Sequence, residues 1–205
     1  MDDKMLVIVK KVKALYTEYG IKSVTMDDVA HELSISKKTL YQHFADKKDL
    51  VLAVIKEDYR KRQIDFSSIL NNKVNAIEEL FLYYKLQIRI IRDHKSSFDY
   101  DLKKYYPDIF NHFHVIKRER ILDSIRKNLI KGKKEGLFRP DLNEDVITRL
   151  NLMRIEGIIH SGIFTTEETV SPDMFLEVYK YHMYGIVSEK GRKILENNLN
   201  KLNRV

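Results

Sequence analysis

A cluster of cationic and hydroxyl side chains lies between residues 34 and 48 of this 205-residue chain. Side chains of these types donate hydrogen bonds to phosphates and to base edges, and a positive local field attracts a polyanion. The cluster therefore favours nucleic-acid recognition. It holds one acidic residue, Asp46, against four lysines: Lys37, Lys38, Lys47 and Lys48.

Two short helices joined by a tight turn would position these side chains. Thr25 and Asp28 have the spacing of a capping box and predict a helix over about 26–33. Ser36 is a suitable cap for a second helix, from Lys37 to about Phe44. This arrangement is the layout of a DNA-binding helix-turn-helix.

The second helix has an apolar face and a polar face. Leu40 and Phe44 lie four residues apart and would face a small core. An ordinary solvated surface is the competing interpretation, but capping, core spacing and charge coincide in this segment. The surface that would contact DNA consists of the residues turned outward: Lys37, Lys38, Tyr41 and Gln42.

The composition is typical of a helical globular protein, with 33% charged residues, 43% apolar residues, seven Gly and three Pro. The net charge of +7 is spread along the whole chain, so on its own it is weak evidence for a partner. The absence of cysteine excludes disulfides, thiolate metal sites and cysteine nucleophiles, and is compatible with a reducing compartment. We expect an all-α, cytoplasmic protein.

Further helices are predicted on both sides of this motif. The only early apolar run, residues 6–9, is too short for a signal peptide or a membrane span, so no membrane partner is expected. Apolar spacing, caps and breaks predict helices over about 3–19, 46–64, 72–95, 100–106 and 108–135, and from Asn143 and Ser171 onward.

The last two long helices carry apolar stripes. One stripe runs through Val146, Leu150 and Met153, and the other includes Tyr179 and Met183. Two apolar helices late in a chain suggest a subunit interface, here between helices at about 143–164 and 172–188 of two copies.

Aromatic residues are dense between positions 81 and 113. Small-molecule sites are commonly apolar cavities with a few hydroxyl groups, although plain core packing is the open alternative. Glu156 and His160 lie four apart on one helix face, as a pocket acid–base pair, two metal ligands or a structural hydrogen-bonded pair would. The candidate ligand-binding residues are Tyr84, Phe98, Tyr106, Phe110, Phe113, Glu156 and His160.

No group of residues in the sequence has the spacing of a catalytic site. The segment 131–136 lacks the pattern of a phosphate-binding loop, and there is no nucleophile elbow. Without cysteine or a His-x-x-x-His pattern, a dedicated metal site is not expected. We therefore expect no catalytic residues, no metal and no cofactor, and a chain that is not an enzyme.

The first 50 residues resemble the TetR family of bacterial transcriptional regulators, with weaker similarity at 135–142 and 189–191. The resemblance implies an all-helical homodimer with a DNA-binding domain at 1–50, an effector-binding and dimerisation domain at 51–205, and a linking helix at about 46–64. The residues that carry it are Ala14-Leu15-Tyr16, Gly20, Val24-Thr25-Met26-Asp27-Asp28-Val29-Ala30, Ser36-Lys37-Lys38-Thr39-Leu40-Tyr41-Gln42-His43-Phe44 and Lys47-Lys48-Asp49-Leu50.

The resemblance also implies roles for individual residues. Thr25 would meet a phosphate at the start of its helix, where free N–H groups and the helix dipole favour an anion. Gln42 suits adenine and the lysines suit guanine. The base edges of the major groove would be contacted by Lys37, Lys38, Thr39 and Gln42, and backbone phosphates by Tyr41, His43 and Lys47.

Two positions depart from the family pattern. Ser34 stands where the family usually has glycine in the turn, so we expect this serine to take a positive φ. Lys38 replaces the small residue that usually precedes Thr-Leu-Tyr. Both departures bear on the fit to the groove and therefore on the operator sequence.

The sequence thus predicts a ligand-released repressor that acts as a homodimer on a two-fold operator in double-stranded DNA. Its effector would be a small molecule of unknown identity. The alternative hypothesis is a DNA-associated structural or partner-binding protein of the same fold, without a small-molecule effector.

Overall fold

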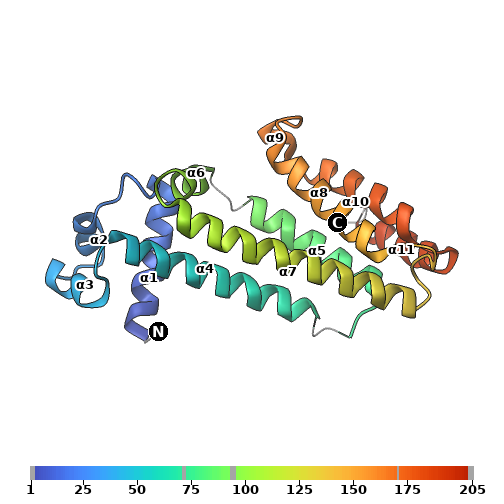
Figure 1. The fold of residues 1–205 in the computed structure, drawn as a ribbon, viewed down its shortest axis with the longest axis horizontal. Helices are drawn as coiled ribbons and strands as arrows, with labels where there is room; N and C mark the ends of the chain where they lie inside the picture. The colour runs from blue at the N-terminus through green and yellow to red at the C-terminus, as the bar shows by residue number, and fades with distance from the viewer. Residues whose placement is uncertain (1–2, 71–72, 93–95, 170, 203–205) are drawn as a thin grey trace. The chain divides into compact units, whose positions relative to one another are not determined.

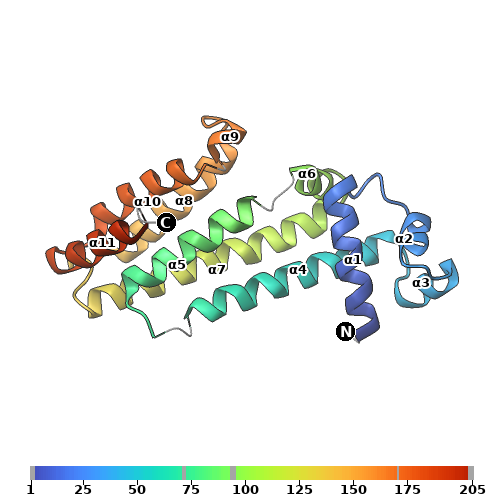
Figure 2. The ribbon, with the colours of Figure 1, turned by 180° about the vertical axis from the view of Figure 1, so that it is seen from behind.

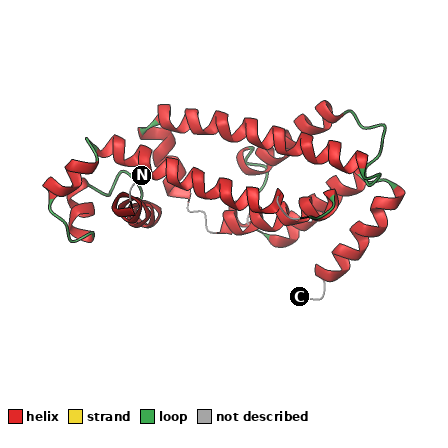
Figure 3. Ribbon diagram, turned by 90° about the horizontal axis from the view of Figure 1, so that it is seen from below, coloured by secondary structure: helices red, strands yellow, loops and turns green. Residues whose placement is uncertain are grey.

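The computed structural model describes residues 3–70, 73–92, 96–169 and 171–202. Within these ranges the chain folds into helices, with one isolated antiparallel bridge between Phe138 and Val187 and no strand (Figures 1 and 3). The expectation of an all-α protein is therefore confirmed. The described chain contains no helix with the length and apolar character that a membrane span requires.

Figure 2 shows the helices from the opposite side to Figure 1. In chain order they are α1 (Asp3–Tyr19), α2 (Met26–Glu32), α3 (Lys37–His43), α4 (Lys47–Leu70), α5 (Ala76–Arg92), α6 (Ser96–Tyr105), α7 (Pro107–Lys134), α8 (Glu144–His160), α9 (Thr166–Thr169), α10 (Pro172–Ile186) and α11 (Glu189–Leu202).

The chain divides into two compact units. The N-terminal unit comprises Met1–Asp65 and His94–Val115, and the C-terminal unit comprises Phe66–Asp93 and Ile116–Val205. None of the three boundaries coincides with the predicted domain limit at residue 50, because α4 as far as Asp65, α6 and the first turns of α7 group with the helix-turn-helix. The predicted assignment of DNA binding to 1–50 and effector binding to 51–205 stays a prediction.

Capping residues place most helix starts where the sequence predicts them. Asn143 Oδ1 accepts hydrogen bonds from the backbone N–H groups of Asp145 and Val146, both at 3.1 Å. Ser171 caps α10, which has proline in its first turn. These side chains satisfy amides that have no partner within the helix, which explains why the predicted starts at Asn143 and Ser171 are confirmed.

Several helix limits differ from the prediction. Helix α4 continues to Leu70 and not to about Ile64, because its charged middle is stabilised by ion pairs from Glu57 to Arg60 at 2.6 Å and from Asp58 to Arg62 at 2.9 Å.

Helix α5 begins at Ala76 and not at 72, since Asn75 Oδ1 accepts hydrogen bonds from two amides of its first turn. The predicted end of this helix, at 93–95, lies outside the described residues. Helix α6 begins at Ser96, earlier than the predicted residue 100. Helix α9 was not predicted, because a single turn is too short to show a hydrophobic period.

The core of the N-terminal unit joins α1, the helix-turn-helix and α6. Tyr16, Leu40, Phe44 and Leu50 are almost completely buried there, and Phe98 of α6 is 4% exposed. Burying side chains of this size is the main stabilising contribution to a small helical module. This core fixes the orientation of α3 relative to α1 and α2.

The core of the C-terminal unit is organised around the end of α7. Ile77, Leu129 and Met183 are fully buried, or nearly so. A Cβ atom on Gly132 would lie 2.1 Å from the ring of Phe138, so only glycine allows this close approach.

A buried polar network lies beside that core. Lys131 Nζ donates a hydrogen bond to Glu79 Oε2 at 2.7 Å, and Asn128 Nδ2 donates to Glu79 Oε1 at 3.0 Å. A buried carboxylate needs such partners, and Glu79 has both. This network therefore joins α5 to α7.

Candidate nucleic-acid interface

The first turn of α2 is closed by a reciprocal capping box. Thr25 N–H donates to Asp28 Oδ2 at 2.7 Å, Asp28 N–H donates to Thr25 Oγ1 at 3.1 Å, and the Thr25 hydroxyl lies 2.6 Å from Asp28 Oδ2. Hydrogen bonds from the Thr25 side chain and backbone lower the pKa of Asp28. The predicted capping box is confirmed, and Thr25 is exposed at the helix start where a phosphate contact is predicted.

The turn between α2 and α3 has the strained conformation that the sequence predicts. Ser34 has a φ of 53°, which makes it the one non-glycine residue with positive φ in the described part of the chain. Its N–H donates to His31 O at 2.9 Å, and Ile35 N–H donates to Ala30 O at 3.0 Å. These bonds hold the two helices in a fixed relation despite the cost of the left-handed conformation.

Helix α3 begins at a second side-chain cap. Ser36 Oγ accepts a hydrogen bond from Thr39 N–H at 3.0 Å and lies 2.8 Å from Thr39 Oγ1. Thr39 is half-buried, and its hydroxyl takes part in the cap. The hydroxyl is therefore less available for a contact with a base edge than the sequence predicts. The cap fixes the first turn of the predicted DNA-contacting helix.

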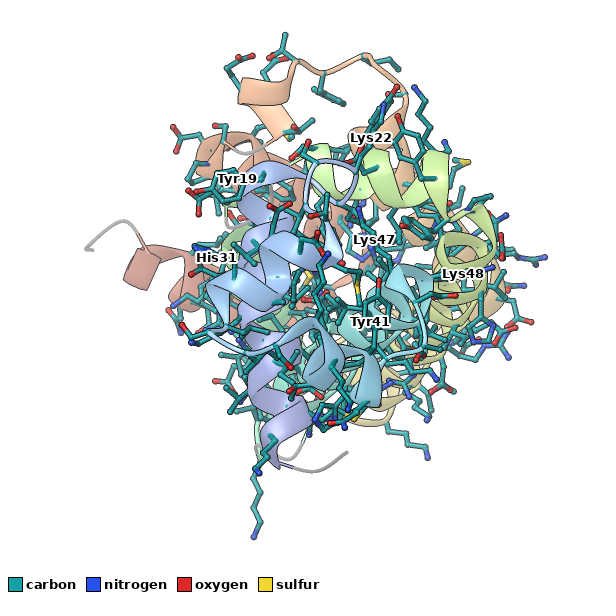
Figure 4. The ribbon with its side chains drawn as sticks, turned by 90° about the vertical axis from the view of Figure 1, so that its left-hand side faces the viewer. Tyr19, Lys22, His31, Tyr41, Lys47 and Lys48 are labelled. Atoms are coloured by element: carbon teal, nitrogen blue, oxygen red, sulfur yellow. The ribbon has the colours of Figure 1, made fainter. Side chains whose placement is uncertain are left out.

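The outward face of α3 is polar and accessible. Tyr41, which is labelled in Figure 4, is 49% exposed, whereas its neighbour Leu40 is completely buried. Lys38 and Gln42 are also exposed, and His43 is half-buried beside Phe44 at a centroid distance of 6.4 Å. The predicted division of α3 into a core face and an outward face is therefore confirmed.

Two of the four clustered lysines have carboxylate partners. Lys37 Nζ lies 2.5 Å from Asp27 Oδ2, and this hydrogen bond raises the pKa of Lys37. Lys48 Nζ lies 2.6 Å from Asp108 Oδ2 at the start of α7. Both pairs are exposed, so DNA phosphates can compete for the lysines.

Lys47 is held closer to the protein than Lys48. Its Nζ atom donates a hydrogen bond to Lys22 O at 3.2 Å, and it is half-buried. Burial lowers the pKa of Lys47, while Asp101 and Asp28 act in the opposite direction. Figure 4 shows Lys22 and Lys47 close to each other beside α6.

Sequence reasoning missed the acidic residues that organise this surface. Asp27 pairs with Lys37, Asp108 pairs with Lys48, and Asp101 accepts a hydrogen bond from Lys22 N–H. Asp27 and Lys37 carry opposite charges near the starts of the two helices of one motif, and this signal could have predicted their ion pair. Asp101 and Asp108 lie far along the chain, and nothing in the local sequence connects them with residues 22 and 48.

The predicted ligand-binding residues fall into two different cores. Phe98, Tyr106, Phe110 and Phe113 pack in the N-terminal unit against the core that supports the helix-turn-helix. Tyr84 packs in the C-terminal unit. The structure therefore does not gather the predicted aromatic residues around one cavity within either unit.

Of the predicted pair Glu156 and His160, the structure describes the side chain of Glu156 alone. Glu156 Oε1 forms an ion pair with Arg118 Nε at 2.9 Å. The side chain of His160 lies outside the described residues. The predicted ligand role of both residues stays a prediction.

A surface hollow of about 370 Å³ opens between α7 and α8. None of the predicted ligand-binding residues lines it. The residues around it are Leu122, Asp123, Arg126, Asp145, Thr148 and Arg149. Among the side chains that the structure describes, no group of three His, Cys, Asp or Glu has the geometry to hold a metal ion.

A capped helix, a tight turn and a second capped helix with an exposed polar face define a helix-turn-helix DNA-binding protein. Residues 8–54 match the family model of the bacterial regulatory proteins, tetR family. An HTH-type transcriptional regulator of Staphylococcus aureus (strain bovine RF122 / ET3-1) is 30% identical over 132 residues, which cover 54% of this chain and 71% of that protein. The chain belongs to the TetR family and is a transcriptional regulator with a DNA-binding helix-turn-helix.

Another curated relative shows the same coverage pattern. An HTH-type transcriptional regulator of Staphylococcus aureus (strain USA300) is 31% identical over 113 residues, or 47% of this chain and 61% of that protein. The sequence similarity to these relatives thus covers only part of each chain.

Solved structures extend the likeness in fold along most of the chain. A transcriptional regulator from Cytophaga hutchinsonii ATCC 33406 has a TM-score of 0.77 at 19% identity, covering 91% of this chain and 100% of that chain. A TetR-family transcriptional regulator from Streptomyces coelicolor has a TM-score of 0.69 at 19% identity, covering 87% and 93%. At these identities the likeness concerns the fold alone.

Proposed function

We propose that this regulator is a repressor that binds a two-fold DNA operator as a homodimer and is released by a small-molecule effector. The observation that carries the DNA-binding part is the outward face of α3, where Tyr41 is 49% exposed on a helix anchored by the buried Leu40. A helix presented in this way enters a major groove with its polar side chains toward base edges and phosphates.

The contacts on DNA follow from where each side chain lies. Lys38 and Gln42 are exposed on α3 and would contact base edges, together with Lys37 once phosphate or base competes with Asp27. Thr39 would make a smaller contribution because its hydroxyl takes part in the cap. Phosphates would be held by Thr25, Tyr41, His43 and Lys47.

An exposed apolar stripe supports the homodimer. Leu150 is 48% exposed and Met153 is 65% exposed on α8, and Tyr181 is 82% exposed on α10. Apolar side chains gathered on neighbouring helix faces mark a surface that another protein covers. We infer that α8 and α10 pair with the same helices of a second copy, within the predicted ranges 143–164 and 172–188. On α10 the exposed residue is Tyr181, whereas the predicted stripe through Tyr179 and Met183 is buried in the core of the C-terminal unit.

The dimer sets the geometry of the operator. With one α3 helix from each subunit in a major groove, half-site centres lie about 34–36 Å apart, or a multiple of that distance. An effector releases DNA by favouring a separation of the two α3 helices that does not match, with a coupling free energy of about 1–3 kcal/mol typical of such systems. We place effector binding in residues 51–205 and DNA binding in 1–50, with residues 46–64 as the link, in a cytoplasmic protein.

The test is binding of the full chain to tiled fragments of the DNA upstream of its own gene. Fluorescence anisotropy at fixed salt with competitor DNA should identify one palindromic fragment bound with a Kd in about the nanomolar range. Uniformly weak, strongly salt-dependent binding to every fragment would contradict the proposal and favour a DNA-associated structural protein.

A matched pair of variants links that binding to α3. Tyr41→Ala should weaken operator binding, whereas Tyr100→Ala should leave it unchanged, because Tyr100 is similarly exposed but lies on α6. Equal affinity of both variants would contradict the assignment of α3 to the groove.

A further inference from the structure

A cation with no counter-ion among the described residues lies in the C-terminal unit. Arg154 of α8 is half-buried, and its Nε atom has neither exposed surface nor a hydrogen-bond partner. Its guanidinium donates a hydrogen bond from Nη2 to Asn151 Oδ1. No carboxylate of the described chain forms an ion pair with Arg154, and Glu156, two residues further along α8, is paired with Arg118.

An imidazole on α10 completes the unpartnered group. His182 is half-buried, and its Nε2 atom also has no exposed surface and no hydrogen-bond partner. Burial, and to a smaller extent the positive charge of Arg154, lower the pKa of His182 to about 3. The imidazole is therefore neutral at physiological pH and carries one N–H group.

These two unpartnered groups lower the stability of the protein when no other molecule is bound to them. The buried Nε atom of the guanidinium and the buried ring nitrogen of His182 both lose their hydration without gaining a hydrogen-bond partner in the described chain. Burial lowers the pKa of Arg154 to about 10, which is the same cost expressed as a proton affinity. Proteins keep such groups where another molecule supplies the missing partner.

An aromatic cluster joins α10 to α5 near His182. Tyr179 lies one turn before His182, and its ring centroid is 5.1 Å from that of Tyr84 and 6.0 Å from that of Phe81. The hydroxyl of Tyr179 is buried without a partner, whereas Tyr84 donates a hydrogen bond to Pro172 O at 3.1 Å. An apolar surface next to a cationic and hydrogen-bonding group is the usual form of a site for a small amphipathic molecule.

We propose that Arg154 and His182 bind the carboxylate of a small organic acid, whose apolar part packs against Phe81, Tyr84 and Tyr179, and that this acid is the effector. One positive charge and one neutral N–H group match a monoanion, whereas a phosphate dianion would leave an unbalanced negative charge. The planar guanidinium pairs with the two oxygens of a carboxylate, and Asn151 holds it in orientation. The proposal rests on the proposed function, since an effector presupposes a ligand-responsive regulator.

The experiment compares acids with uncharged and cationic analogues. Benzoate, 4-phenylbutyrate and octanoate, and the corresponding alcohols and amines, are added to the full chain at fixed ionic strength. The thermal unfolding midpoint and calorimetric affinity are then measured. We expect at least one acid to raise the midpoint and to bind more tightly than its alcohol and amine. Failure of all three acids to bind, or equal binding of the amines, overturns the proposal.

Variants connect the binding to the two residues. Arg154→Met should weaken the acid roughly tenfold to a hundredfold, as expected for the loss of a charged hydrogen bond. Arg118→Met is the control for the loss of a positive charge in this unit, because Arg118 is half-exposed and already paired with Glu156, and this variant should bind the acid normally. Arg154→Lys keeps the charge without the planar fork and should bind with intermediate affinity, which covers the case in which the methionine variant does not fold. Unchanged affinity in both Arg154 variants overturns the site.

Two further readouts separate this proposal from its rivals. His182→Gln should bind the acid better than His182→Leu, because glutamine retains a side-chain N–H donor.

A carboxylate of the partner subunit is the competing occupant. If it pairs with Arg154, then Arg154→Met would be monomeric by light scattering and no acid would bind the wild-type dimer, which overturns the effector site. Operator binding without any acid is measured in parallel, so that its loss tests the proposed function and not the anion site.

Discussion

The carboxylate of Asp101 accepts a hydrogen bond from the backbone N–H of Lys22 at 2.8 Å, although 79 residues separate them in sequence. The carbonyl of Lys22 accepts a second bond, from Lys47 Nζ at 3.2 Å. The peptide that connects α1 with α2 is thus held by α6 on one side and by α4 on the other. The helix-turn-helix is not a free-standing module, because α6 contributes to its geometry.

Replacing Asp101 should loosen this junction. Asp101→Ala leaves the Lys22 N–H without its partner, and we expect a loss of about 1–2 kcal/mol in the free energy of unfolding. Asp101→Asn keeps an acceptor oxygen and should lose less. Urea denaturation followed by circular dichroism measures both values, and equal stability of the alanine variant and the wild type would show that the contact contributes nothing.

Tyr41→Ala and Lys47→Ala should weaken operator binding while the oligomeric state stays unchanged. Each variant removes one phosphate contact, so we expect roughly a fivefold to thirtyfold higher Kd, corresponding to about 1–2 kcal/mol. The Lys47 variant should also flatten the salt dependence by about one counterion. Anisotropy titrations at several salt concentrations give both quantities, with Lys193→Ala of α11 as the control for the loss of a positive charge.

Asp27→Asn should increase binding to DNA of unrelated sequence. The substitution removes the carboxylate that holds Lys37 Nζ at 2.5 Å and frees that charge for phosphates. We expect a steeper salt dependence, by about one counterion, and a smaller ratio of operator to random-DNA affinity. Asp123→Asn, which breaks the comparable Lys127 pair on α7, should leave both unchanged. The double variant Asp27→Asn with Lys37→Ala should abolish the increase.

Ser34→Gly should stabilise the protein slightly. The φ of 53° strains serine but not glycine, and the gain is offset in part by the greater entropy of glycine in the unfolded chain. We expect a net stabilisation of about 0.5 kcal/mol, whereas Ser34→Val should destabilise because a branched side chain tolerates this conformation poorly. Thermal unfolding midpoints would reveal the order Gly above Ser above Val.

Met153→Glu and Tyr181→Glu should dissociate the proposed dimer. Each places a carboxylate on the exposed apolar stripe, where pairing with a second copy would bury the charge without a partner. Light scattering after size exclusion should report half the mass of the wild type. Val115→Glu is the control, since this residue is also apolar and 54% exposed but lies on α7 in the N-terminal unit.

Local signals explain which helix starts could be predicted. Thr25, Ser36, Asn143 and Ser171 each satisfy free amides of the helix that follows, so one or two residues determine the boundary. The strained Ser34 was predictable for the same reason, because the constraint belongs to a single turn. The end of α4 was not, since it depends on ion pairs in a polar stretch that resembles the end of a helix.

The site was predictable only where its residues come from one segment. The outward face of α3 follows from helical spacing around the buried Leu40, so a single segment of sequence is enough to predict it. Asp101 and Asp108 reach the interface through tertiary packing, which no local pattern reveals. The same limit applies to the ligand-binding residues, because an aromatic-rich segment cannot show that Phe98 and Tyr84 belong to separate cores.

The ion pairs of Lys37 with Asp27 and of Lys48 with Asp108 also affect how such a regulator searches a chromosome. Two of its four clustered lysines arrive at any DNA already neutralised by the protein's own carboxylates. A duplex without the operator sequence must displace those carboxylates and gains little binding free energy from the phosphate contacts that replace them. The protein therefore leaves such sites quickly. Only the operator adds base contacts whose free energy outweighs the loss of the two ion pairs. The acidic residues thereby shorten the time that the protein spends bound to other sequences.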